Sequence, residues 1–154
     1  MSWARIIVAG ILFVIVSQII HSVEAYATLD FYMDPTYCQV EAETGNVGVC
    51  VWSKIMMPTA GPPPNEFYYY SIVFGVITGI IYAVVYAMIK KSVLGKTIVK
   101  QGIYFGFFLF LLGIPHFLSM YLLINLSTML LVYWTISGLI VNLIGGVVIA
   151  YIVK

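Results

Sequence analysis

No charged side chain interrupts the stretch TMLLVYWTISGLIVNLIGGVVIAYIV, residues 128–153. A helix needs roughly 20 apolar residues to cross a hydrocarbon core about 30 Å thick. Three more apolar blocks of this length precede it, at residues 5–27, 68–90 and 101–124. Transmembrane barrel strands are excluded, because they are about ten residues long and alternate in polarity. The sequence therefore predicts an all-α polytopic membrane protein, a four-helix transmembrane bundle that forms a single membrane domain over residues 1–154.

The composition agrees with a membrane protein. Hydrophobic residues make up 62% of the 154 residues and charged residues only 8%, whereas about a quarter of the residues in a soluble domain are charged. We expect a lipid bilayer around the helices and no nucleic-acid partner.

The charges predict an orientation. Six of the seven basic residues lie at the two ends of the chain or around the 91–100 connection: Arg5, Lys90, Lys91, Lys96, Lys100 and Lys154. All six acidic residues lie on the opposite side: Glu24, Asp30, Asp34, Glu41, Glu43 and Glu66. Because short loops rich in Lys and Arg face the cytoplasm, we expect a multi-pass protein of the cytoplasmic membrane with both termini inside the cell.

The first apolar block also resembles a cleavable secretory signal. Met1–Arg5 supplies a basic start, and Ala25-Tyr26-Ala27 offers small residues of the kind found at cleavage sites. The apolar run continues through Ile20, however, and we expect an uncleaved first helix.

Residues 28–67 form the outer loop. Val40, Val47, Val49 and Val51 favour a short β-hairpin about Thr44-Gly45-Asn46. This hairpin would place Cys38 opposite Cys50. Because the loop is expected to face an oxidising compartment and the chain has no other cysteines, a Cys38–Cys50 disulfide is predicted.

Small residues recur along three of the blocks. They are Ser71, Gly75, Gly79 and Ala83 in the second block, Gly102 and Gly106 in the third, and Gly138 and Gly146 in the fourth. Such stripes let helix backbones approach closely within lipid. They predict a tight bundle, and a homodimer through the second helix is the alternative use.

The candidate functional residues are the intramembrane polar groups, because ionisable side chains are costly in lipid. Gly10, Ser17, His21, Glu24 and Thr28 recur at helical spacing and share one face of the first helix.

On the third helix, His116 is assigned to the side of Gly102, Gly106 and Gly113. It lies as far beyond Lys100 as His21 lies beyond Arg5, so the two imidazoles are expected at similar depth.

Four interpretations of these residues stay open. His21, Glu24 and His116 could hold a transition metal, or the two histidines could ligate a haem. Ser17, Gln18, Thr135 and Asn142 could instead add hydrogen bonds to a proton or solute path. In the fourth interpretation the groups only support the fold: His21 hydrogen-bonds Glu24 at the headgroup boundary, and His116 caps a carbonyl freed by Pro115. No cofactor is favoured.

The second half of the chain carries a weak family resemblance. It runs from Leu94-Gly95-Lys96 through Gly102, Gly106, Gly113, Pro115 and Ser119 to residues 121–126, YLLINL. This pattern resembles small four-span membrane proteins of uncharacterised families in bacteria and archaea. The resemblance implies the same bundle and carries no substrate or catalytic residue.

The sequence favours an accessory or structural subunit, with or without a membrane-protein partner, or a small transporter-like bundle. A redox, metal-binding or haem-binding subunit that uses His21 and His116 is the alternative. No Ser-His-Asp order, HExxH pattern or dinucleotide loop is present, so an enzyme is not the favoured interpretation.

Overall fold

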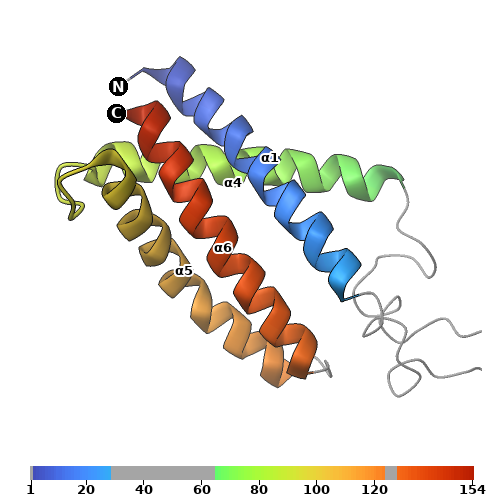
Figure 1. Ribbon diagram of the computed structural model, residues 1–154. Coiled ribbons are helices and arrows are strands. Elements are labelled where there is room, and N and C mark those ends of the chain that lie inside the picture. The colour runs from blue at the N-terminus through green and yellow to red at the C-terminus, as the bar shows by residue number, and fades with distance from the viewer. Residues whose placement is uncertain (1, 29–64, 124–127) are drawn as a thin grey trace, which may run out of the picture.

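The computed structural model describes residues 2–28, 65–123 and 128–154 (Figure 1). These residues form four helices: α1 (Trp3–Ala27), α4 (Asn65–Ile89), α5 (Ile98–Leu123) and α6 (Thr128–Val153). All four are long and apolar enough to cross a membrane, and the described ranges contain no strand. The prediction of four spanning-length helices is confirmed. The predicted hairpin and the Cys38–Cys50 disulfide lie outside the described residues.

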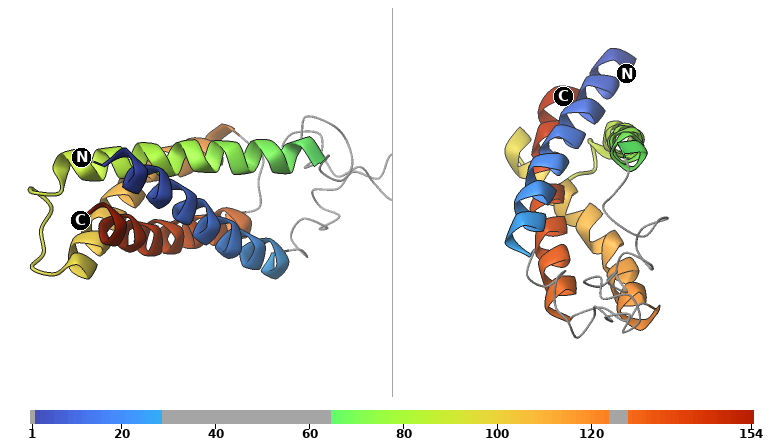
Figure 2. Two further views of the ribbon diagram at one scale, coloured as in Figure 1. Left: turned by 90° about the horizontal axis from the view of Figure 1, so that it is seen from above. Right: turned by 90° about the vertical axis from the view of Figure 1, so that its right-hand side faces the viewer.

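The helices are arranged around α6 and α1. Helix α6 packs along α5 on one side and against α1 on the other, and α1 in turn packs against α4. Figures 1 and 2 show α4 crossing the other three helices obliquely, with α5 on the far side of α6. Both ends of the described chain lie at the same end of the bundle, as four spans require.

Glycines set the crossing of α1 and α4. A Cβ atom added to Gly79 would lie 2.6 Å from the carbonyl oxygen of Gly10, so the two backbones touch. One turn earlier on α4, Gly75 faces the side chain of Val14. The predicted small-residue stripe of α4 therefore packs against α1 within the chain, and that surface is not open to a second copy.

Helices α5 and α6 pack by the same device. A Cβ on Gly146 would lie 2.8 Å from the Cα of Gly106, and a Cβ on Gly102 would lie 2.8 Å from the backbone nitrogen of Val147. Gly106 also faces the backbone carbonyl of Asn142. Small residues on both helices allow this contact, which gains dispersion energy over the length of the pair.

The buried core lies in the half of the bundle near the chain termini. Its members are Ile6, Ala9 and Phe13 of α1, Ala83 and Tyr86 of α4, Phe105 and Leu109 of α5, and Val141, Ile149, Ala150 and Val153 of α6. Toward the other end, α4 separates from α1 and from the α5–α6 pair (Figures 1 and 2). Polar groups of α1 and α6 lie where the helices separate.

The turn between α4 and α5 is built locally. Gly95 has a φ of 130°, a conformation that side chains with a Cβ rarely adopt. The Gln101 amide donates to the Gly95 carbonyl at 3.0 Å and accepts from the Tyr86 hydroxyl at 3.3 Å. The Thr97 hydroxyl accepts from the Lys100 backbone N–H at 3.3 Å, as an N-cap does. This cap explains why α5 begins at Ile98, three residues before the predicted start.

Candidate functional site

A cavity of about 370 Å³ lies between the diverging helices. Its walls come from all four helices and combine polar and aromatic groups. The lining residues are Phe13, Ser17, His21 and Glu24 of α1, Thr78 and Tyr82 of α4, Phe117 of α5, and Trp134, Gly138, Val141 and Asn142 of α6. The volume is at the lower end of the range for small-molecule pockets.

The polar face of α1 supplies one wall. Ser17, His21 and Glu24 follow one another at helical spacing and all line the cavity, as the sequence predicted for this face. Gly10, on the same face, packs instead against α4 at the core end. Thr28 ends the face and is fully buried.

Glu24 is the ionisable group that is most enclosed in this wall. Only 10% of its side chain is exposed, compared with 50% for His21. The Thr28 hydroxyl lies 3.1 Å from Glu24 Oε1 and 2.8 Å from the Glu24 backbone oxygen, and it can donate to either. Glu24 Oε2 lies 3.8 Å from His21 Nδ1, too far for a hydrogen bond but within ion-pair range when the imidazole is protonated. The carboxylate thus keeps an oxygen that no described residue hydrogen-bonds.

Asn142 supplies a second unpaired acceptor. Its Nδ2 donates to the Gly138 carbonyl one turn earlier on α6, at 2.8 Å. Its Oδ1 is buried and has no hydrogen-bond donor among the described residues. An unsatisfied buried carbonyl costs about 1–3 kcal/mol, so a donor from a bound molecule or a water would stabilise this site.

Aromatic rings form the rest of the cavity wall. Phe13 and Tyr82 pack edge to face, with ring centroids 5.4 Å apart. Phe117 reaches the cavity from α5 over Gly138, where an added Cβ would lie 3.2 Å from its ring. Trp134 lines the cavity from α6. The cavity therefore combines two acceptors with several ring faces and edges.

His116 does not join this site. It is exposed, and its neighbour Phe117 lines the cavity in its place. Phe117 is eleven residues after Gly106, close to three full turns, and so lies on nearly the same face of α5 as Gly106. The structure does not bring His116 to the cavity that His21 and Glu24 line.

No three-residue metal centre forms in the part of the chain that the structure describes. No group of three or more His, Cys, Asp and Glu side chains comes together there. His21 and Glu24 lie close to each other, and the third predicted ligand, His116, belongs to another face of the bundle. A haem that is ligated by both histidines meets the same difficulty, because only His21 reaches the cavity.

Two further predicted polar residues have other roles. The Gln18 amide donates to the Ser71 hydroxyl at 3.1 Å and links α1 to α4. The Thr135 hydroxyl donates to the Leu131 carbonyl within α6. Neither residue lines the cavity.

Sequence analysis missed the contributions of α4 and α5 to the cavity. Thr78 and Tyr82 are four residues apart and so share one face of α4, but they lie among apolar neighbours that give no reason to single them out. Phe117 could have been found by following the Gly106 face for three turns. The aromatic content of the wall depends on which helices are neighbours.

Comparison with protein-family models, curated proteins and solved structures found no match. The resemblance of the second half to small four-span families therefore stays a prediction.

Proposed function

We propose that this protein is a small transporter-like membrane bundle whose cavity binds a small organic cation, such as an ammonium compound. The observation that carries the proposal is the presence in one cavity wall of two residues with an acceptor that has no donor among the described residues, Glu24 Oε2 and Asn142 Oδ1. A cation that carries N–H groups would donate to Glu24 Oε2, and it would reach Asn142 Oδ1 after a side-chain movement, because that oxygen is buried in the wall. Its charge would be balanced by the Glu24 carboxylate.

The rest of the wall suits the same ligand. Phe13, Tyr82, Phe117 and Trp134 offer aromatic rings, and a cation within about 6 Å of a ring centroid is attracted to the negative face of the ring. An anion would meet the Glu24 carboxylate and the same rings, both of which disfavour it.

The position of the cavity supports transport over surface binding. The cavity lies within the span of all four helices and in the half away from the termini. With both termini in the cytoplasm, a ligand would enter from the outer face, where the helices diverge. The tightly packed core closes the cytoplasmic half, so release to the cytoplasm needs α1 and α4 to move relative to α6.

An accessory role is the second candidate, and the placement of α5 favours it. This helix packs mainly against α6. The side chains of its last turn are exposed, and 83% of Leu123 is accessible. A partner helix could bind on that side of the bundle. Purification in mild detergent tests the idea: a stoichiometric partner that stays with the protein would favour it, and a lone stable protein would remove it.

Calorimetric titration of the purified protein with diethylammonium, a cation with two N–H groups, tests the cation site. We expect saturable binding that falls at least about tenfold in affinity in Glu24→Gln, since removal of one partner of a desolvated charge pair costs about 2–5 kcal/mol. Glu66→Gln is the matched control, because Glu66 is exposed in the first turn of α4 and does not line the cavity. The uncharged diethylacetamide should bind poorly. Equal affinity in Glu24→Gln and wild type would overturn the proposal.

A further inference from the structure

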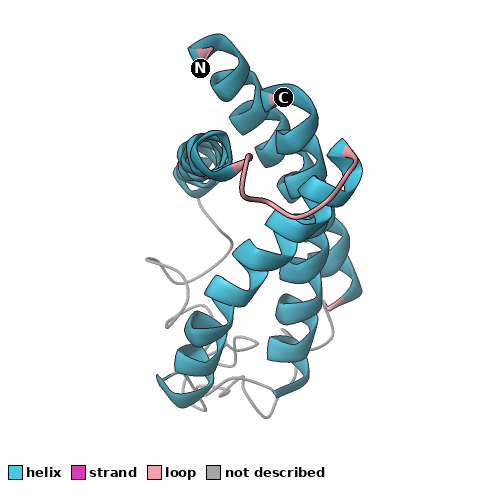
Figure 3. Ribbon diagram, turned by 90° about the vertical axis from the view of Figure 1, so that its left-hand side faces the viewer, coloured by secondary structure: helices cyan, strands magenta, loops and turns pink. Residues whose placement is uncertain are grey.

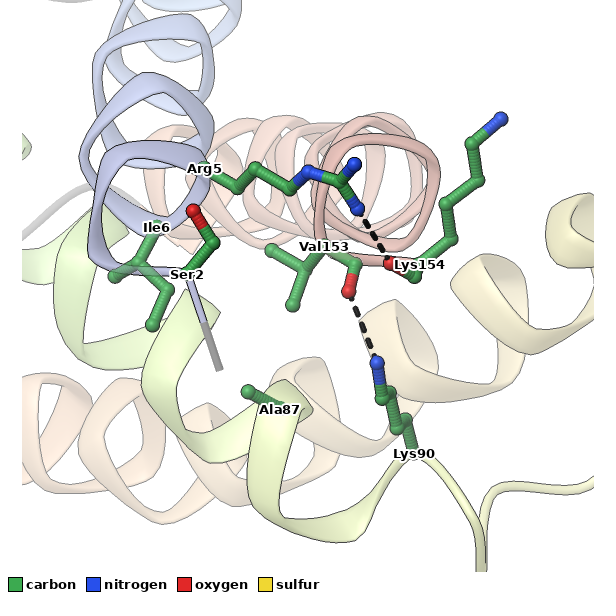
Figure 4. A pocket seen from close by; sticks show the side chains of 7 residues that line it. All are labelled: Ser2, Arg5, Ile6, Ala87, Lys90, Val153 and Lys154. Atoms are coloured by element: carbon green, nitrogen blue, oxygen red, sulfur yellow. Dashed lines mark hydrogen bonds between the residues drawn. The ribbon is translucent and has the colours of Figure 1, made fainter.

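A second cavity lies at the opposite end of the bundle, where both chain termini meet. Its volume is about 280 Å³, and it is lined by Ser2, Arg5 and Ile6 of the α1 end, Ala87 and Lys90 of the α4 end, and Val153 and Lys154 of the α6 end. Figure 4 shows Arg5 and Lys90 reaching from two helices toward the last carbonyls of α6. Figure 3 shows the loop from α4 to α5 at the same end of the bundle.

This end of the protein carries positive charge without acidic side chains. The sequence has no Asp or Glu before Glu24 and none after Glu66, so residues 1–23 and 67–154 supply only cations. Six of the seven basic residues belong to these segments: Arg5, Lys90, Lys91, Lys96, Lys100 and Lys154. An anion bound here would meet no acidic side chain from the neighbouring described elements, and the main-chain oxygen of Lys154 at this cavity is held by Arg5.

The two cations at the cavity are only partly used by the protein. Arg5 Nη1 donates to the Lys154 carbonyl at 3.0 Å, and Lys90 Nζ donates to the Val153 carbonyl at 3.1 Å. A guanidinium has five N–H donors and an ammonium has three, so most donors of both groups stay available. Lys154 contributes differently, because its ammonium lies over the Tyr151 ring, 4.3 Å from the centroid.

The carbonyl contacts also position the cations. They hold Arg5 and Lys90 at the C-terminal end of α6, where the helix dipole favours positive charge. Both groups are thereby ordered before any ligand arrives, which lowers the entropic cost of binding. Ser2, at the start of α1, lines the same cavity, and its hydroxyl does not cap the helix.

Apolar side chains complete the cavity. Ile6, Ala87 and Val153 line it beside the cations, and Ile6 and Val153 belong to the core that faces the membrane interior. A ligand with a phosphate group and an adjoining apolar part fits this division, because the phosphate would contact Arg5 and Lys90 and the apolar part would lie beside Ala87 and Val153. Basic pockets at the ends of transmembrane helices recognise such headgroups.

We infer that the cavity formed by Arg5, Lys90, Ser2 and the α6 end is a binding site for a phosphate group, supplied by an anionic phospholipid of the surrounding leaflet. The site is separate from the cation cavity, so it stands or falls independently of the proposed transport function.

Lipid retention measured by native mass spectrometry tests the inference. The full chain is incubated with phosphatidylglycerol and phosphatidylcholine of the same acyl chains in equal amounts. We expect retention of phosphatidylglycerol over phosphatidylcholine by about fivefold or more, which corresponds to one well-placed cation near the surface. Lys90→Gln and Arg5→Gln should each remove most of this preference. Wild-type protein that retains both lipids equally would overturn the inference.

Lys91→Gln is the matched control. Lys91 follows Lys90 directly, is exposed and does not line the cavity, so its loss should leave the preference unchanged. If Lys91→Gln reduces the lipid preference as much as Lys90→Gln does, the lipid binds to a diffuse basic surface, and the proposal of a defined site is overturned. Glu24→Gln should also leave lipid retention unchanged.

Two further measurements keep the test valid if a variant folds poorly. Lys90→Arg should retain the preference, because an arginine also binds phosphate. In wild-type protein, about 0.5 M salt should leave at least part of the preference, since screening weakens an enclosed contact less than an exposed one. Loss of the preference in Lys90→Arg, or its complete loss in salt, would contradict an enclosed phosphate site.

Competition with inorganic phosphate identifies the source of the group. If phosphate at millimolar concentration leaves phosphatidylglycerol bound, the apolar part contributes and the ligand is a lipid. If it displaces the lipid, the cavity recognises the phosphate group alone, and a soluble phosphate compound replaces the lipid as the ligand.

Discussion

At the scale of single residues, Glu24 determines the chemistry of the cation cavity. Its side chain is nearly enclosed, one of its oxygens lies near the Thr28 hydroxyl, and the other oxygen has no donor among the described residues. The sequence located Ser17, His21 and Glu24 correctly because helical periodicity is a local property of one segment. It also grouped His116 with these residues, whereas the structure leaves His116 exposed and outside the cavity.

Thr28→Val tests how the carboxylate is positioned. The change removes the hydroxyl near Glu24 Oε1 while it keeps the size of the side chain. We expect diethylammonium affinity to fall severalfold, less than in Glu24→Gln, and stability to fall by about 1 kcal/mol. Ser22→Ala is the control, because the Ser22 hydroxyl bonds the Gln18 carbonyl on the exposed side of α1. If Thr28→Val leaves the affinity unchanged, the Thr28 hydroxyl does not help to position the Glu24 carboxylate.

At the scale of helices, close backbone contact determines which elements are neighbours. The small-residue stripes of α4, α5 and α6 predicted that another helix can approach each of them closely. In the structure, a neighbouring helix packs against each of these stripes. The stripes did not identify the partners, since the pairing of Gly79 with Gly10 and of Gly106 with Gly146 depends on matched positions in two segments. Periodicity within one helix contains no information about that match.

Gly79→Ala tests the α1–α4 contact. The new Cβ would lie 2.6 Å from the Gly10 carbonyl oxygen, so the backbones must separate. We expect a loss of about 1–3 kcal/mol, as in other overpacked interfaces, in unfolding by sodium dodecyl sulfate from mild detergent.

Gly113→Ala is the control for this helix contact. A Cβ there would meet only the Phe117 ring, at the ordinary distance of 3.9 Å. Similar stability of the two variants would contradict the close crossing of α1 and α4.

At the scale of the whole molecule, tight packing at one end and divergence at the other create two sites of opposite charge preference. Length and hydropathy predicted the four spans well, because the thickness of a bilayer imposes them directly. The divergence was not predictable, since it follows from the oblique crossing of α4. The cavity therefore could not be outlined from the sequence, although four of its polar residues, Ser17, His21, Glu24 and Asn142, were among the sequence candidates.

The orientation of the bundle is tested by cysteine labelling. In a background with Cys38→Ser and Cys50→Ser, a cysteine in place of Lys96 should be protected from membrane-impermeant thiol reagents in intact cells, because the basic end is expected in the cytoplasm. A cysteine in place of Asn65, at the other end of α4, should be labelled. The reverse pattern would place both termini outside.

The central claim is that the cavity between the diverging helices binds an organic cation through Glu24. Trp134 lines that cavity, and Trp3→Phe with Trp52→Phe would leave it as the only tryptophan. The most direct measurement is Trp134 fluorescence during titration with diethylammonium. We predict a saturable change that shifts to at least about tenfold higher ligand concentration in Glu24→Gln. A fluorescence that diethylammonium leaves unchanged, or an identical titration in Glu24→Gln, would contradict the claim.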